Sequence, residues 1–151
     1  MVLSEVAEDI PDFKFSILAT DISTLVLEKA RQGIYSIDKV EPVEMALKKK
    51  YLLRGKGAQN NMVRVVPKLR SMVSFRRLNF LDRDFGLTQP MDIIFCRNVI
   101  IYFDQPTQKE LLDKLTGHLA SDRYIFMGHS ETLNGLNLPL TQVSPSVYRK
   151  K

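Results

Sequence analysis

One acidic side chain stands where a strand of an α/β protein is expected to end. Phe15–Ala19 is a short apolar run followed directly by Thr20 and Asp21, and this pattern predicts a buried strand with a carboxylate at its carboxyl end. Ligands of open α/β sheets bind beyond that end of the strands, and a carboxylate there accepts both hydroxyl hydrogens of a ribose. The same residue suits a turn or cap before a helix that begins near Ser23, so spacing alone leaves both roles open.

Three polar side chains follow a second expected strand. Asp92–Cys96 is a nearly continuous apolar run, the pattern of a strand buried on both faces, and Arg97, Asn98 and Tyr102 come soon after it. An aromatic ring attracts a cation such as a sulfonium, and a mixture of hydrogen-bond donors and acceptors suits the tail of an α-amino acid. The alternative is a surface ion pair at Arg97 and a core position for Tyr102.

A third candidate pair is Asn79 and Phe80, which follow an alternating, strand-like segment. The ring can pack against a flat base while the amide reads its edge, although an aromatic residue in such a place is often part of the core. Motifs of other chemistries are absent: there is no Gly-x-Gly-x-x-Gly, no Walker loop, no nucleophile elbow and no Cys/His metal cluster. No metal site is predicted, and we interpret His118, His129 and Cys96 as structural.

The scaffold that must position these side chains is predicted to be of the α/β class. A chain of 151 residues with 44% hydrophobic and 26% charged residues is typical of one globular domain, and no apolar run approaches the roughly 18–20 residues that span a bilayer. A single cysteine fits a reducing cytoplasm. Beyond the strands above, the expected elements are helices over 1–10, 23–32 and from Asp104 (apolar stripe Leu111, Leu112, Leu115, Leu119), a strand Tyr124–Met127, and a terminal hairpin of Leu140–Val143 with Ser146–Tyr148.

The middle of the chain, approximately residues 42–72, differs in character. Pro42–Tyr51 resembles a short helix, and turn signals at Arg54–Gly57 and Asn60-Asn61 precede the strand-like Met62–Val66. We interpret this part as a small antiparallel hairpin, a β-subdomain inserted into the α/β fold. The segment from Val73 to Asn79 is then expected to rejoin the main sheet.

The net charge of +5 comes largely from three basic clusters, Lys48–Lys50, Arg76–Arg77 and Arg149–Lys151. Such clusters are usually solvated faces, and the alternative is an acidic partner, either a nucleic acid or a glutamate-rich protein surface. Aromatic residues do not interleave with these clusters, which disfavours a nucleic acid.

Five segments resemble the CheR family of protein-glutamate methyltransferases in order and spacing. The most specific is the stretch Phe95–Phe103. The resemblance implies a Rossmann-like methyltransferase fold with a mixed sheet, a terminal antiparallel hairpin and an inserted β-subdomain, and residues 1–151 would form a partial catalytic domain. The segments are Ile17–Ser23, Val73–Phe80, Asp92–Asp104, Met127–Glu131 and Val147–Lys150.

By this resemblance, a methyl group passes from S-adenosylmethionine to glutamate side chains of chemotaxis receptors, giving glutamate methyl esters and S-adenosylhomocysteine. A glutamate, with a reference pKa of about 4.3, is already ionised at neutral pH and needs no general base. Asp21 would bind the ribose hydroxyls. Asn79 and Phe80 would line the adenine pocket, although leucine is more usual at position 80. Beside the methionine portion and the sulfonium, the resemblance places Arg97 and Asn98 as cofactor-binding residues and Tyr102 as the catalytic residue.

The resemblance also implies that the chain starts within the helix that follows the family's first cofactor loop. The central strand of the sheet would then be missing, and the uncovered edges favour self-association through the truncated sheet. The expected partner is the cytoplasmic domain of methyl-accepting chemotaxis receptors, with no nucleic acid and no membrane insertion, in the cytoplasm. The competing hypothesis is a non-catalytic module that binds the receptor or another partner.

Overall fold

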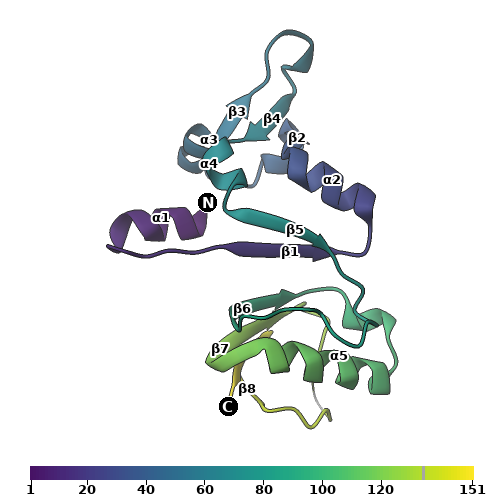
Figure 1. The fold of residues 1–151 in the computed structure, drawn as a ribbon. Coiled ribbons are helices and arrows are strands. Elements are labelled where there is room, and N and C mark those ends of the chain that lie inside the picture. The colour runs from purple at the N-terminus through teal and green to yellow at the C-terminus, as the bar shows by residue number, and fades with distance from the viewer. Residues whose placement is uncertain (134) are drawn as a thin grey trace. The chain divides into compact units, whose positions relative to one another are not determined.

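In the computed structural model, which describes residues 1–133 and 135–151, the chain divides after Asn79 into two units, Met1–Asn79 and Phe80–Lys151. Figure 1 shows both units. The first unit contains two sheets and the second unit one, each with helices of its own unit, so each unit is described by itself.

The first unit contains a parallel pair of strands, β1 (Ile17–Asp21) and β5 (Val73–Arg77). Helix α2 (Thr24–Gln32) packs beside them (Figure 1). The Ser23 side chain accepts a hydrogen bond from the Val26 amide at the start of α2, and Gly33 ends the helix with φ 63°, which glycine adopts without steric cost. The predicted strand and helix are confirmed.

The prediction that the first strand is buried is wrong. Ile17 is 39% exposed and Thr20 is also exposed. Within the described residues, β1 pairs with β5 alone, and a strand with one neighbour and a helix on one side keeps much of its surface open.

The inserted part of the first unit is a three-stranded antiparallel sheet rather than a two-stranded hairpin. Its strand order is β2-β4-β3, so β4 lies in the middle. The sequence predicted the two later strands and missed β2, because three residues directly after a helix-ending glycine are too few to show an alternating pattern. The elements are β2 (Ile34–Ser36), a 3-10 helix (Ile37–Val40), α3 (Met45–Tyr51), β3 (Leu52–Arg54), a 3-10 helix (Gly57–Gln59), β4 (Met62–Val65) and α4 (Pro67–Arg70).

One lysine of the predicted solvated cluster ties two helices together. The Lys50 ammonium lies 2.7 Å from Glu5 Oε1 and 2.5 Å from Glu8 Oε2, and both glutamates belong to α1 (Val2–Asp9). The Tyr51 hydroxyl also donates to Glu5. The hydrogen bond from Lys50 lowers the pKa of Glu5, and the bond to Glu5 raises the pKa of Lys50. Through Lys50, the cluster Lys48–Lys50 therefore links α3 to α1 and does not only face solvent.

The second unit is a mixed four-stranded sheet in the order β6-β7-β9-β8; Figure 1 labels β6, β7 and β8 of this sheet. The β6–β7 pair is parallel and the other pairs are antiparallel, so the predicted terminal hairpin is confirmed. The predicted mixed α/β fold class is confirmed as well. The elements are β6 (Met91–Cys96), a 3-10 helix (Ile100–Tyr102), α5 (Gln105–His118), β7 (Leu119–Met127), β8 (Leu140–Ser144) and β9 (Val147–Lys150).

The core of the second unit lies between α5 and β7. The predicted apolar stripe of α5 is buried, with Leu112 0% and Leu111 2% exposed, and Ile125 of β7 is 0% exposed. The prediction that β6 is buried on both faces is wrong, because Ile93 is 47% and Phe95 69% exposed. The helix covers one face of this sheet, and alternate residues of a strand point to opposite faces.

A lysine of the C-terminal cluster closes the end of α5. Lys150 Nζ donates to the carbonyl oxygens of Thr116 (2.7 Å) and Leu119 (2.6 Å) at the C-terminal end of α5, where a positive charge interacts favourably with the helix dipole. We expect Lys150→Met to lower the free energy of unfolding of the second unit by about 1–2 kcal/mol, since two charge-assisted hydrogen bonds are lost from a half-buried site. Denaturant unfolding measures this loss. The neighbouring exposed Lys151→Met is the control, and an equal effect of both variants would contradict the capping role.

Candidate functional site

Two predicted cofactor residues lie together in the first unit, at the carboxyl ends of its paired strands. Asp21 ends β1 opposite Arg77, and Asn79 follows two residues later in the chain. The Leu78 amide donates to the Asp21 carbonyl oxygen at 3.1 Å, which extends the pairing beyond the strands. Both residues are half-buried.

One oxygen of the Asp21 carboxylate already accepts a hydrogen bond from the neighbouring backbone. Its Oδ1 accepts the Ser23 amide at 2.8 Å, just before α2, so the turn role left open by the sequence is realised. An ionised carboxylate offers about four lone-pair sites on two oxygens. One such bond orients the group and leaves acceptor capacity for a ligand.

In the second unit, the loop after β6 carries Arg97, Asn98 and Tyr102. Asn98 has a left-handed backbone with φ 58°, a conformation that asparagine tolerates better than most residues. Tyr102 is 79% exposed, so the alternative of a core tyrosine is wrong, whereas Ile100 beside it is 2% exposed. The buried isoleucine anchors the loop and leaves the polar side chains on the surface.

A carboxylate that the sequence reasoning missed holds this loop. Glu131 is 6% exposed, and its two oxygens accept four backbone amides. Burial alone would raise its pKa, but the four amide donors outweigh burial and hold the pKa of Glu131 below its usual value. Oε1 accepts from Val99 (2.7 Å) and Ile100 (2.9 Å), and Oε2 accepts from Asn98 (2.9 Å) and Gly128 (2.6 Å).

A close approach of backbone explains the glycine at the end of β7. A Cβ atom at Gly128 would lie 2.6 Å from Glu131 Oε2 and 3.0 Å from the Asn98 backbone nitrogen. Gly128 and Glu131 fall in the segment Met127–Glu131, where the pattern of a strand, a glycine and then an acid three residues later was the available signal. The structural role of this pattern depends on a contact with a loop about 30 residues earlier in the chain, and residue spacing does not reveal that contact.

The other candidate residues of the sequence are Phe80, His118 and Cys96, and all three lie in the second unit. Phe80 lies in the second unit, half-buried, with its ring edge-on to Phe85 at 6.1 Å between centroids. His118 stacks on the same Phe85 at 5.8 Å, which supports its structural interpretation. Burial, with a smaller contribution from the Glu131 charge, raises the pKa of the Cys96 thiol to about 12, so it stays neutral at pH 7. Asp21 and Asn79 thus belong to one unit and the other candidates to the second.

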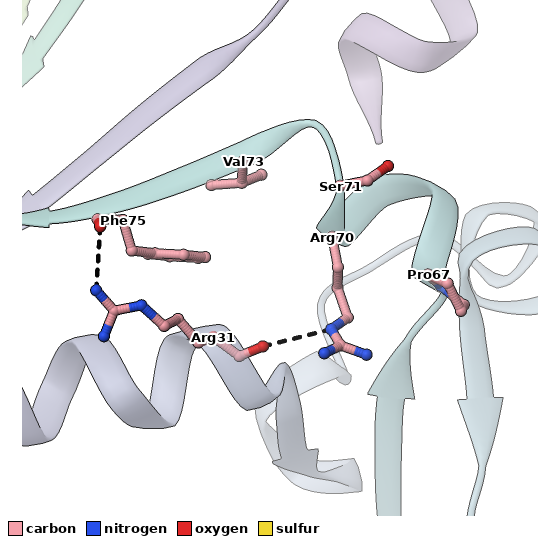
Figure 2. A pocket seen from close by; sticks show the side chains of 6 residues that line it. All are labelled: Arg31, Pro67, Arg70, Ser71, Val73 and Phe75. Carbon is pink, nitrogen blue, oxygen red and sulfur yellow. Dashed lines mark hydrogen bonds between the residues drawn. The ribbon is translucent and has the colours of Figure 1, made fainter.

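A concave region of the first unit contains none of these residues. This region is a cavity of about 330 Å³ lined by residues of α2, α4 and β5. Figure 2 shows the side chains that line it. Arg31 Nη2 donates to the Phe75 carbonyl oxygen (3.1 Å), and Arg70 Nε donates to the Arg31 carbonyl oxygen (3.3 Å). The Arg31 guanidinium fastens the last turn of α2 to β5, and the Arg70 guanidinium fastens the same turn to α4. We therefore interpret the cavity as a structural junction. Its lining is Arg31, Pro67, Arg70, Ser71, Val73 and Phe75.

Residues 1–133 and 135–151 hold no group of three or more His, Cys, Asp or Glu side chains placed to bind a metal ion. Over the same residues, every helix is too short or too polar to cross a membrane.

In each unit a parallel strand pair leads into polar side chains, an acid and an amide in the first unit and exposed Arg, Asn and Tyr in the second. Polar groups at the carboxyl ends of parallel strands are typical of α/β proteins that bind cofactors. Residues 1–148 match the family model described as "CheR methyltransferase, SAM binding domain". The chain therefore belongs to this family, and the predicted family and its cofactor, S-adenosylmethionine, are confirmed.

Curated relatives agree with this assignment. The chain is 42% identical over 132 residues to chemotaxis protein methyltransferase 2 of Pseudomonas aeruginosa, covering 87% of this chain and 47% of that protein. It is 43% identical to the chemotaxis protein methyltransferase of Borreliella burgdorferi (92% and 48% covered) and 40% identical to that of Escherichia coli (89% and 47% covered). The chain spans about half the length of the curated relatives it matches.

Proposed function

We propose that this chain supplies S-adenosylmethionine contacts for methyl transfer to glutamate side chains of chemotaxis receptors. The family match over residues 1–148 carries the proposal. Three relatives named as chemotaxis methyltransferases, at 40–43% identity, support the reaction and the receptor substrate.

The residues present fit the cofactor. The half-buried Asp21 keeps acceptor capacity for the two hydroxyls of a ribose, and Asn79 next to it offers an amide to the edge of a base. In the second unit, Phe80 carries an apolar ring of the kind that packs against a base. On the loop after β6, the exposed side chains of Arg97 and Asn98 suit the carboxylate and amine of the methionine portion.

In methyl transfer, the task of these residues is to orient two reactants. The cofactor supplies an activated methyl group, and the receptor glutamate is already an anion at neutral pH. Tyr102, exposed at the end of the loop, offers a ring face to a sulfonium and a hydroxyl to the incoming carboxylate. Catalysis then rests on alignment and on excluding water, with no proton transfer required of the protein.

Calorimetric titration with S-adenosylhomocysteine tests the proposal. We expect the chain to bind it and Asp21→Ala to weaken binding by about 100-fold, because two charge-assisted hydrogen bonds of about 1.5 kcal/mol each are lost. Asp82→Ala, at an exposed position in the second unit, is the control and should bind as the unchanged chain does. A folded chain that does not bind the ligand would rule out cofactor binding by this chain, and equal binding by Asp21→Ala would rule out the ribose role.

A second candidate function is a non-catalytic module that binds the receptor or another partner. The exposed apolar side chains of Ile93 and Phe95 on β6 favour it. These apolar side chains also support self-association through the open sheet. In both cases we place the chain in the cytoplasm, with a receptor cytoplasmic domain as partner. For the methyl-transfer function, we treat residues 1–151 as part of one catalytic domain with an inserted β-subdomain at approximately 42–72.

A further inference from the structure

The four amides that meet at Glu131 come from two places in the second unit. Three are consecutive, at Asn98, Val99 and Ile100, and the fourth is Gly128, just beyond β7. Cys96 and Met127 are paired across the parallel strands β6 and β7. One side chain therefore joins the ends of two neighbouring strands at the edge where the cofactor loop starts.

The backbone of the loop forms a concave array of donors. Asn98 is left-handed (φ 58°) and Val99 right-handed (φ −116°, ψ −53°), and successive amides in such alternating conformations point toward a common anion. In this protein the anion is the Glu131 carboxylate. These amides are already satisfied, so the loop can contact a ligand through its side chains but not through those three backbone groups.

We propose that Glu131 is the positioning residue of the cofactor loop, whose carboxylate sets the backbone at Asn98–Ile100 and thereby the direction of Arg97, Asn98 and Tyr102. The inference rests on the proposed function and adds a residue that acts through others rather than on the reactants. It also accounts for the left-handed Asn98 and for the glycine at position 128, since both permit the carboxylate to reach all four amides.

Each oxygen of Glu131 accepts two amides, so no neutral isostere can replace the carboxylate. In Glu131→Gln, one side of the amide group would turn a donor toward two amide donors, whichever way the side chain is flipped. A buried, unpaired backbone amide carries the full cost of its lost hydrogen bond. We therefore expect the loop to open in Glu131→Gln while the α5–β7 core, whose side chains make none of these bonds, stays folded.

Amide hydrogen exchange and titration with S-adenosylhomocysteine, on the same preparations of the chain, test the inference. In Glu131→Gln we expect exchange at Asn98, Val99 and Ile100 to accelerate at least tenfold and affinity to fall at least tenfold. Ile125→Val removes one methylene from the core of β7 and is the control for lost stability alone, with affinity within twofold of the unchanged chain. Glu131→Asp keeps the charge on a shorter side chain and should lie between Gln and the unchanged chain in both measurements.

The outcomes separate the inference from the function on which it rests. If the unchanged chain binds the ligand and Glu131→Gln binds equally well, the positioning role is wrong and the proposed function stands. If Ile125→Val weakens binding as much as Glu131→Gln, the effect is one of stability and the inference is also overturned. If the unchanged chain does not bind, both fail together. Should Glu131→Gln not fold, Glu131→Asp decides, and unaltered affinity with unprotected loop amides would refute the role.

Discussion

Gly128→Ala is expected to lower the free energy of unfolding of the second unit by about 2–4 kcal/mol. The new Cβ would lie 2.6 Å from Glu131 Oε2, 2.8 Å from Asn98 Oδ1 and 3.0 Å from the Asn98 backbone nitrogen. Real Cβ contacts are not this short, and the nitrogen belongs to a loop that is itself bonded to Glu131. Either the carboxylate leaves its amides or the loop moves, and both remove charge-assisted hydrogen bonds from a buried place. Denaturant unfolding measures the loss, and exchange at the Asn98 amide locates it.

Gly117→Ala is the matched control for this prediction. Gly117 lies within α5, and a Cβ there would meet nothing within 4 Å. Alanine favours a helix over glycine by about 0.5–1 kcal/mol, so this variant should be as stable as the unchanged chain or slightly more so. If Gly128→Ala behaved like Gly117→Ala, the close approach of the loop to the end of β7 would be wrong.

Leu112→Ala is expected to cost about 2–5 kcal/mol, through lost burial and the cavity left behind. Leu112 is 0% exposed at the centre of the α5 stripe, opposite a strand whose Ile125 is also 0% exposed. Alanine keeps the helix, so the loss reports packing rather than helix propensity. Thermal or denaturant unfolding followed through the second unit measures it.

The control for the core prediction is an exposed leucine on another helix. Leu25 on α2 is 83% exposed, and Leu25→Ala should change stability by no more than about 0.5 kcal/mol. A loss below about 1 kcal/mol for Leu112→Ala would mean that α5 does not form the core of its unit.

The ends of a helix, the buried side of α5 and the terminal turn could be predicted from the sequence. Ser23 and Gly33 mark the ends of α2, the leucines at 111, 112 and 115 mark the buried side of α5, and Pro145, directly after β8, marks the turn between the terminal strands. Each of these signals acts over a few residues, through capping, helical periodicity or turn chemistry. The family resemblance likewise rests on contiguous segments, and the match over residues 1–148 confirmed it.

Burial of the strands was decided only by the tertiary structure. The apolar runs at β1 and β6 predicted strands with two covered faces, yet Ile17, Ile93 and Phe95 are exposed. An apolar run shows that a strand is able to be buried, whereas the elements beside it determine which face is covered. The short β2 was missed for a related reason, because its strand character comes from pairing with β4 and not from its own three residues.

For the candidate site as well, the sequence determined some features and the tertiary structure determined others. Sequence alone determined which residues bear polar groups at strand ends, namely Asp21 on β1 and the loop that carries Arg97, Asn98 and Tyr102. It did not determine that Glu131, some 30 residues further along, would hold that loop through four amides. Backbone amides are the same at every residue and leave no mark in the sequence, so only the parallel pairing of β6 with β7 brings this carboxylate to its partners.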